Sequence, residues 1–128
     1  MKEELKELLY YSRSKYFSFP VSSIIVCTNG EKFSGVNVET ASPAAGCCAE
    51  RVALYAALSH GKTIDDFSEI HIMNNTESYV YPCFICRQAL MEYCPPSLKV
   101  ITYSKDFKSD TVYLKDLCPY PFAQKDLK

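Results

Sequence analysis

The spacing of hydrophobic residues indicates a helix followed by a hairpin at the start of the chain. Between residues 3 and 14, leucines recur at helical spacing among charged side chains, which predicts an amphipathic helix that covers a sheet. The segments VSSIIVC and EKFSGVNVE flank Asn29-Gly30, the dipeptide that most strongly indicates a tight hairpin turn. The sequence therefore predicts two antiparallel strands that meet at this turn, the second ending near Glu39.

The middle of the chain carries two more helical patterns, each followed by a strand pattern. From Cys48 to about Ser59, small apolar residues recur on one helical face, and Gly61 suits the helix end. Alternating isoleucines then indicate a strand. A second helix is predicted from Cys83 to Pro95-Pro96, where two prolines end it. The segments LKVITY and TVYLK are typical of short strands.

Helices that follow strands, with five strands in all, predict an α/β domain built on a mixed sheet. A length of 128 residues suits one compact unit, so we expect a single domain over residues 1–128. No stretch approaches the ~18 apolar residues of a membrane span. The first segment, MKEELKELLYYSRSKY, has acidic residues where a signal peptide is apolar, so we expect a cytoplasmic protein.

Composition indicates which class of ligand the protein binds and which role its cysteines have. The chain has 14 basic and 15 acidic residues and a net charge of −1, which does not favour binding to nucleic acid or to an acidic membrane. A small neutral ligand fits this balance better. Seven cysteines, an odd number without a secretory signal, argue for reduced thiols with a metal or catalytic role and against a disulfide framework.

Spacing separates three of the cysteines from the others. Cys83 and Cys86 form a Cys-x-x-Cys, and Cys48 stands far upstream in a Cys-Ala-Glu step. Each cluster falls in the first turn of a predicted helix, where free N–H groups and the helix dipole favour the metal-binding thiolate. Sulfur suits zinc, and three protein ligands leave a position for water, as in catalytic zinc sites. The remaining four are predicted to be small buried hydrophobes: Cys27, Cys47, Cys94 and Cys118.

Two charged residues beside Cys48 are candidates to support chemistry at this metal. Glu50 can take a proton from a zinc-activated water and pass it on. Its simpler interpretation is an acidic residue that complements the helix dipole. Arg51 can donate hydrogen bonds to the sulfurs and offset the charge of three thiolates, and Arg87 is a second candidate; either can instead form an ordinary surface ion pair.

Two longer segments together resemble a known family. GVNVETASPAAGCCAERVAL, at 35–54, and YPCFICRQALMEYC, at 81–94, resemble the cytidine deaminase family in its small, homotetrameric, three-cysteine zinc branch. The resemblance implies a three-layer α/β/α fold with a mixed five-stranded sheet. It implies Glu50 as proton donor and acceptor. It also implies one zinc ion per subunit, bound by Cys48, Cys83 and Cys86.

The resemblance also assigns a substrate and its contacts. It implies hydrolysis of cytidine or deoxycytidine to the uridine product and ammonia, within pyrimidine salvage, by a homotetramer. Asn37 and Glu39 match residues that hold the ribose hydroxyl, although polar residues at a strand edge need no such role. Phe19 matches a residue of the substrate pocket, and Phe122 matches one contributed by the neighbouring subunit, although either side chain suits a core.

Three short segments depart from the family pattern. Lys15-Tyr16-Phe17 stands where the family usually has Pro-Tyr-Ser, and Ser22-Ser23 stands in place of Gly-Ala. In the metal-binding loop, Phe84 and Ile85 occupy positions that are usually small. These departures bear on the shape of the pyrimidine pocket and on packing around the zinc, and they leave the ligand set intact.

Two alternatives remain open from the sequence. The same fold and chemistry can serve another aminopyrimidine nucleoside, such as a blasticidin-type substrate. The chain can also be a non-catalytic structural zinc module, with Cys47 as a fourth sulfur. The sequence has no motif that distinguishes cytidine from deoxycytidine.

Overall fold

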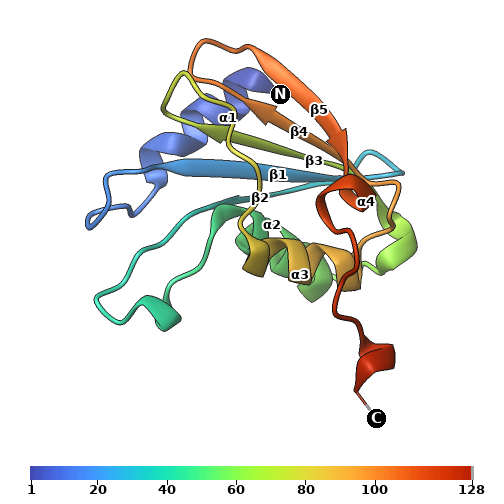
Figure 1. Ribbon diagram of the computed structural model, residues 1–128. Helices are drawn as coiled ribbons and strands as arrows, with labels where there is room; N and C mark the ends of the chain where they lie inside the picture. The colour runs from blue at the N-terminus through green and yellow to red at the C-terminus, as the bar shows by residue number, and fades with distance from the viewer. Residues whose placement is uncertain (128) are drawn as a thin grey trace.

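A five-stranded mixed sheet organises the protein. The computed structural model describes residues 1–127 and orders the strands β2-β1-β3-β4-β5 (Figure 1). β3 and β4 pair in parallel, and the other neighbouring strands pair antiparallel, which confirms the predicted mixed sheet. The strands are β1 (Val21–Cys27), β2 (Lys32–Val36), β3 (Phe67–Asn74), β4 (Lys99–Tyr103) and β5 (Ser109–Tyr113).

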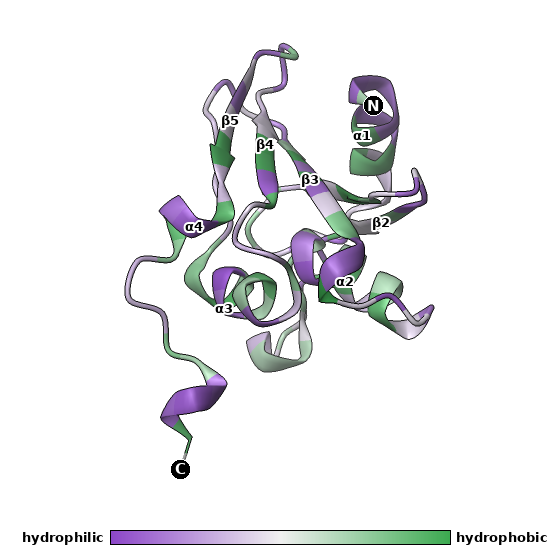
Figure 2. Cartoon of the chain, turned by 90° about the vertical axis from the view of Figure 1, so that its right-hand side faces the viewer, coloured by the Kyte–Doolittle hydropathy of each residue, from purple (hydrophilic) through white to green (hydrophobic). Residues whose placement is uncertain are grey.

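Helices cover both faces of this sheet and make the predicted three layers. α1 lies on one face, and α2 and α3 lie side by side on the other (Figures 1 and 2). The α-helices are α1 (Lys2–Leu8), α2 (Ala49–Ser59), α3 (Phe84–Tyr93) and α4 (Leu114–Leu117). The 3₁₀ turns are η1 (Leu9–Tyr11), η2 (Pro43–Ala45), η3 (Ile64–Asp66) and η4 (Gln124–Asp126). None of these helices combines the length and apolar character that a membrane span needs.

The core is divided by the sheet into two clusters. Neighbouring strand residues point to opposite faces, so Ile25 packs toward α2 and α3 while Ile24 packs toward α1. The larger cluster fills the α2 and α3 side and includes Leu54, Ile70 and Leu90. The α1 side holds the smaller cluster, of Leu5, Ile24, Met73 and Tyr103. The larger part of the core therefore lies on the side of the sheet that α2 and α3 cover.

Two strand ends differ from the sequence expectation. β2 ends at Val36 and not near Glu39, because the next residues bond to other parts of the chain. The Asn37 N–H donates to the carbonyl of Val21, and Val38 makes single bridges to Arg13 and Cys47. At the other end, β5 stops at Tyr113, and the last residues of TVYLK begin α4 instead.

Helix α2, which begins directly after Cys48, packs closely on β2. Three of its buried residues are alanines, Ala49, Ala53 and Ala57, and Gly35 of β2 lies directly beneath it. A Cβ atom at Gly35 would stand 2.6 Å from the amide nitrogen of Ala53 and 2.7 Å from the carbonyl oxygen of Ala49. Both contacts involve backbone, which cannot rotate away. Glycine at this position therefore sets the height of α2 above the sheet.

We predict that Gly35→Ala destabilises the fold by about 1–3 kcal/mol or more, because the added methyl group must push α2 away from β2. Ser34→Ala, on the exposed face of the same strand, is the matched control and should change stability by less than about 0.5 kcal/mol. Urea unfolding of both variants measures the difference. Equal stability of the two would show that α2 is not in contact with β2 here.

Candidate metal centre

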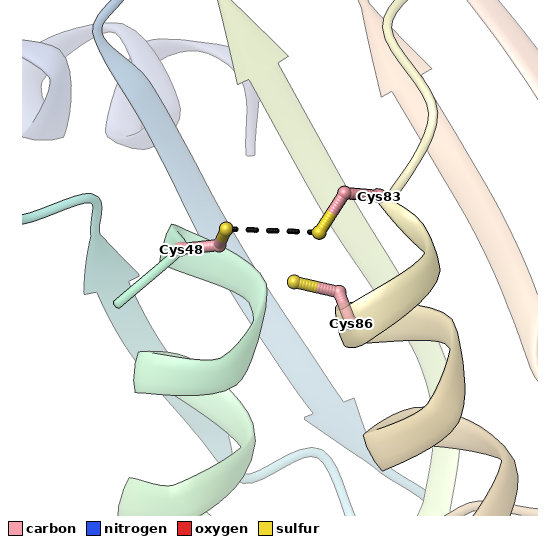
Figure 3. A group of neighbouring side chains, drawn as sticks. All are labelled: Cys48, Cys83 and Cys86. Carbon is pink, nitrogen blue, oxygen red and sulfur yellow. Dashed lines mark hydrogen bonds between the residues drawn. The ribbon is translucent and has the colours of Figure 1, made fainter. Parts of the chain in front are cut away.

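Three cysteine sulfurs meet where α2 and α3 begin. Cys48 is the residue just before α2, Cys83 is the residue just before α3, and Cys86 lies in the first turn of α3. The two helices lie next to each other, and their first turns face each other (Figure 3). The Sγ atoms of Cys48 and Cys83 are 3.8 Å apart, and all three sulfurs lie within 4.8 Å of one another. The fold thus brings together the three cysteines that spacing selected.

This sulfur spacing fits zinc. A tetrahedral zinc ion with Zn–S bonds of ~2.3 Å separates its sulfur ligands by ~3.8 Å. Cys86 is fully buried, Cys48 is half-buried and Cys83 is exposed, so one side of the cluster faces solvent. The arrangement holds three ligands and is accessible from outside, as a catalytic zinc site requires.

Cys47 does not join this group among the described residues. Its backbone pairs with Val38, through N–H to carbonyl bonds of 3.0 and 2.9 Å, and this bridge fixes the chain just before α2. Cys47 therefore does not act as the fourth sulfur that a closed structural site needs. Of the other cysteines, Cys27 and Cys94 are buried as predicted, whereas Cys118 is only half-buried.

The cluster favours a thiolate on Cys48. The hydrogen bond from the Cys86 thiol, and then those from Arg51 and Cys83, lower the pKa of Cys48 to about 5 against the opposing effect of burial. The pKa of Cys86 rises correspondingly, because its thiol bonds to Cys48 and is buried. The site therefore holds a metal-binding thiolate at neutral pH.

The two arginines take different places. The Nη2 of Arg51 donates to the Cys48 sulfur at 3.8 Å, the position expected for it. Burial alone would lower the pKa of Arg51, but the sulfurs of Cys86 and Cys48 raise it above its usual value. Arg87, the second candidate, donates instead to two carbonyls, Pro82 at 2.7 Å and Leu117 at 3.1 Å. Arg51 is thus the arginine that contacts the sulfurs.

Glu50 is buried beside the sulfur cluster. It lies in the first turn of α2, and only 6% of it is exposed. Burial raises the pKa of its carboxyl to about 7; its own backbone N–H opposes this shift and the charge of Cys48 adds to it. A carboxyl with a pKa near neutrality can both accept and donate a proton. Its burial and raised pKa distinguish Glu50 from an exposed acidic residue that only complements the helix dipole.

A cavity of ≈ 310 Å³ opens next to this cluster. It joins the start of α2 to the segment that follows β2, so residues from three parts of the chain line it. Its lining includes Phe17, Asn37, Glu39, Cys48, Arg51 and Ile85. Asn37 and Glu39, predicted to contact ribose, are therefore in the same cavity as a metal-binding cysteine.

Asn37 and Glu39 already make hydrogen bonds within the chain. The Oδ1 of Asn37 accepts from the Val21 N–H at 2.9 Å and from the Ser12 hydroxyl, while its Nδ2 donates to the Phe19 carbonyl at 2.8 Å. The Oε1 of Glu39 accepts from the N–H groups of Tyr16 and Phe17, at 2.8 and 2.9 Å. Among the described residues, the second amide hydrogen of Asn37 and the Oε2 of Glu39 remain for a ligand.

The phenylalanines are placed differently from each other. Phe19 packs against the larger core cluster, and Phe17, which is 78% exposed, is the one that lines the cavity. Phe122 is 56% exposed on the C-terminal tail, where its carbonyl accepts from Gln88, and lies outside this cavity. Sequence reasoning missed Phe17 and Ile85 as lining residues, although both positions were marked as departures from the family pattern.

The comparisons with known proteins agree with this geometry. The family described as the cytidine and deoxycytidylate deaminase zinc-binding region matches residues 1–102. A cytidine deaminase of Sporosarcina psychrophila is 34% identical over 113 residues, covering 88% of this chain and 81% of that protein. One of Halalkalibacterium halodurans is 32% identical over 112 residues, covering 88% and 83%. The crystal structure of cytidine deaminase from Burkholderia pseudomallei, 32% identical, matches with a TM-score of 0.89 over 94% of each chain.

We predict that the purified protein carries about one zinc ion per chain and that Cys86→Ser reduces this to about zero, because two cysteines hold zinc far less tightly than three. Cys118→Ser, at a half-buried cysteine outside the cluster, is the control and should keep its zinc. Metal analysis after dialysis against a chelator measures both. Full zinc content in the Cys86→Ser protein would exclude this cluster as the metal site.

Proposed function

The chain belongs to the cytidine and deoxycytidylate deaminase family, and we propose that it hydrolyses cytidine or deoxycytidine to uridine or deoxyuridine and ammonia. One observation carries the proposal most strongly. Glu50, a buried carboxyl with its pKa raised to about 7, lies beside three cysteines spaced for zinc. A proton-transfer group next to an open metal site is what hydrolytic deamination needs.

The cysteines and Glu50 have different roles in this reaction. Zinc bound by Cys48, Cys83 and Cys86 would supply a Lewis acid that makes a water molecule acidic. Glu50 takes the first proton of the attacking water and delivers it to the ring nitrogen next to the amine-bearing carbon. It then moves the second proton to the amine, which leaves as ammonia. A carboxyl pKa near neutrality suits both directions of transfer.

Arg51 balances the charge of this centre. Three thiolates around a divalent cation are net negative, which weakens the pull of the metal on its water. The guanidinium at the Cys48 sulfur offsets that charge. Arg51 therefore supports the acidity of the water without contacting the substrate.

The charges of the cavity favour a nucleoside over its 5′-phosphate. Glu39 contributes a carboxylate, and Arg51 is the cation that lines the cavity, where it already bonds to sulfur. A phosphate would thus be repelled by the Glu39 carboxylate, while the Arg51 guanidinium is held against the Cys48 sulfur. The remaining groups of Asn37 and Glu39, an N–H donor and a carboxylate oxygen, suit a sugar hydroxyl instead.

An assembly of several subunits would complete the cavity. Phe17 and Ile85 line it and are themselves exposed to solvent. Other large apolar side chains are exposed over α2, α3 and the tail: Tyr55, Phe84, Tyr93, Tyr120 and Phe122. Exposed apolar groups of this extent are typical of interaction surfaces. We therefore infer a homotetramer in which Phe122 of one subunit reaches the cavity of another and Phe19 lies behind the pocket. We further infer that the protein acts in the cytoplasm, in pyrimidine salvage.

We predict that Glu50→Gln keeps its zinc but loses turnover of cytidine by about 100- to 10,000-fold, since the amide cannot carry the proton. The exposed Glu77→Gln is the control and should leave turnover unchanged. The fall in cytidine absorbance gives the rate, and metal analysis gives the zinc content. A Glu50→Gln protein with the wild-type rate would contradict the role of Glu50.

We also predict that kcat/KM for cytidine and deoxycytidine exceeds that for their 5′-monophosphates by about 100-fold, because Glu39 repels the phosphate while Arg51 is held against the Cys48 sulfur. A panel of both nucleosides, both monophosphates, a blasticidin-type nucleoside and a short single-stranded DNA tests this. Preference for the monophosphate would overturn the substrate assignment. A zinc-loaded protein inert toward the whole panel would favour the structural module.

A further inference from the structure

The exposed ligand Cys83 lies at the end of a loop. Cys86 is buried inside α3, whereas Cys83 ends the irregular segment 75–83 between β3 and α3. Loop residues lose conformational freedom when they bind metal, which costs affinity unless the loop is already fixed. The Cys83 sulfur nevertheless stands 3.8 Å from that of Cys48, the spacing zinc needs.

Upstream of Cys83, side chains of the sheet hold the loop. The hydroxyl of Thr102, on β4, donates to the Val80 carbonyl at 2.8 Å and accepts from the Val80 N–H at 3.3 Å. The hydroxyl of Tyr81 donates to the carboxylate of Asp110, on β5. Two successive loop residues are thus tied to two different strands.

Downstream, Arg87 binds the loop from the other side. Its Nε donates to the carbonyl of Pro82, the residue immediately before Cys83, and its Nη1 donates to the carbonyl of Leu117 at the end of α4. The same guanidinium lies 4.3 Å above the ring of Phe84. Arg87 therefore connects the loop, the first turn of α3 and the C-terminal segment.

We propose that Tyr81 and Arg87 are positioning residues for the metal: together they fix the loop so that Cys83 stands at zinc spacing before the ion binds. The inference rests on the cysteine cluster and does not depend on which substrate is used. It also gives Phe84 a role, since this bulky residue at a usually small position provides the surface on which the Arg87 guanidinium stacks.

The test measures how fast zinc leaves the protein. Loss of a hydrogen bond that holds the loop should let Cys83 detach from the zinc ion more often. Zinc release to an excess of coloured chelator should therefore be about 10-fold faster for Tyr81→Phe and about 10- to 100-fold faster for Arg87→Gln. Arg87→Lys, which keeps the charge and one donor, should lie between Arg87→Gln and wild type. Tyr79→Phe, on an exposed tyrosine two residues away, is the control and should release zinc at the wild-type rate.

A purely structural effect is separated by a second measurement. The free energy of unfolding in urea should differ by less than about 0.5 kcal/mol between zinc-free Tyr81→Phe and the zinc-free wild type, because the Tyr81–Asp110 hydrogen bond lies near the surface. If Arg87→Gln fails to fold, Thr102→Val together with Tyr81→Phe tests the upstream tie alone. Wild-type release rates in the folded variants, or faster release in Tyr79→Phe as well, would overturn the proposal. A wild-type protein that retains zinc but deaminates no nucleoside would sink the proposed function and leave this inference standing.

Discussion

The close contact between α2 and β2 is the constraint on which the site depends. Gly35 lets the helix backbone rest directly on the sheet, and the alanines on the buried face of α2 complete this contact. Because α2 carries Cys48 at its start and Glu50 in its first turn, the height of the helix fixes where both side chains stand relative to α3. Gly35 and the alanines thus determine where Cys48 and Glu50 stand, although they do not themselves belong to the cysteine cluster.

The second constraint is electrostatic. Burial makes the Glu50 carboxyl hard to ionise, while hydrogen bonds from Cys86 and Arg51 make the Cys48 thiol easy to ionise. The two groups are two residues apart in the sequence, yet their pKa values move in opposite directions, to about 7 and about 5. One local environment therefore provides both a ligand that stays charged and a carboxyl that exchanges protons.

Much of this arrangement could be predicted from the sequence. Hydrophobic periodicity predicted the α/β domain with its mixed sheet, and spacing at the helix starts selected the three cysteines, because both depend on short-range rules. The three layers came from the family resemblance. The predicted end of β2, near Glu39, was wrong, because Asn37 makes hydrogen bonds to Phe19 and Val21. These are tertiary contacts, which the local pattern does not reveal. The place of Phe17 at the cavity was likewise missed, because it depends on a hydrogen bond from its N–H to Glu39, across 22 residues of chain.

The parallel pairing of β3 with β4 has a consequence for the order of events during synthesis. The hairpin of β1 and β2 with α2 is made of contacts close in sequence, so Cys48 and Glu50 can reach their places early. Cys83 and Cys86 lie on the crossover between the two parallel strands, which cannot dock until β4 has left the ribosome. We therefore expect the metal to enter a nearly finished chain and not to nucleate its folding, so cellular zinc supply should limit the loading of this protein more than its yield.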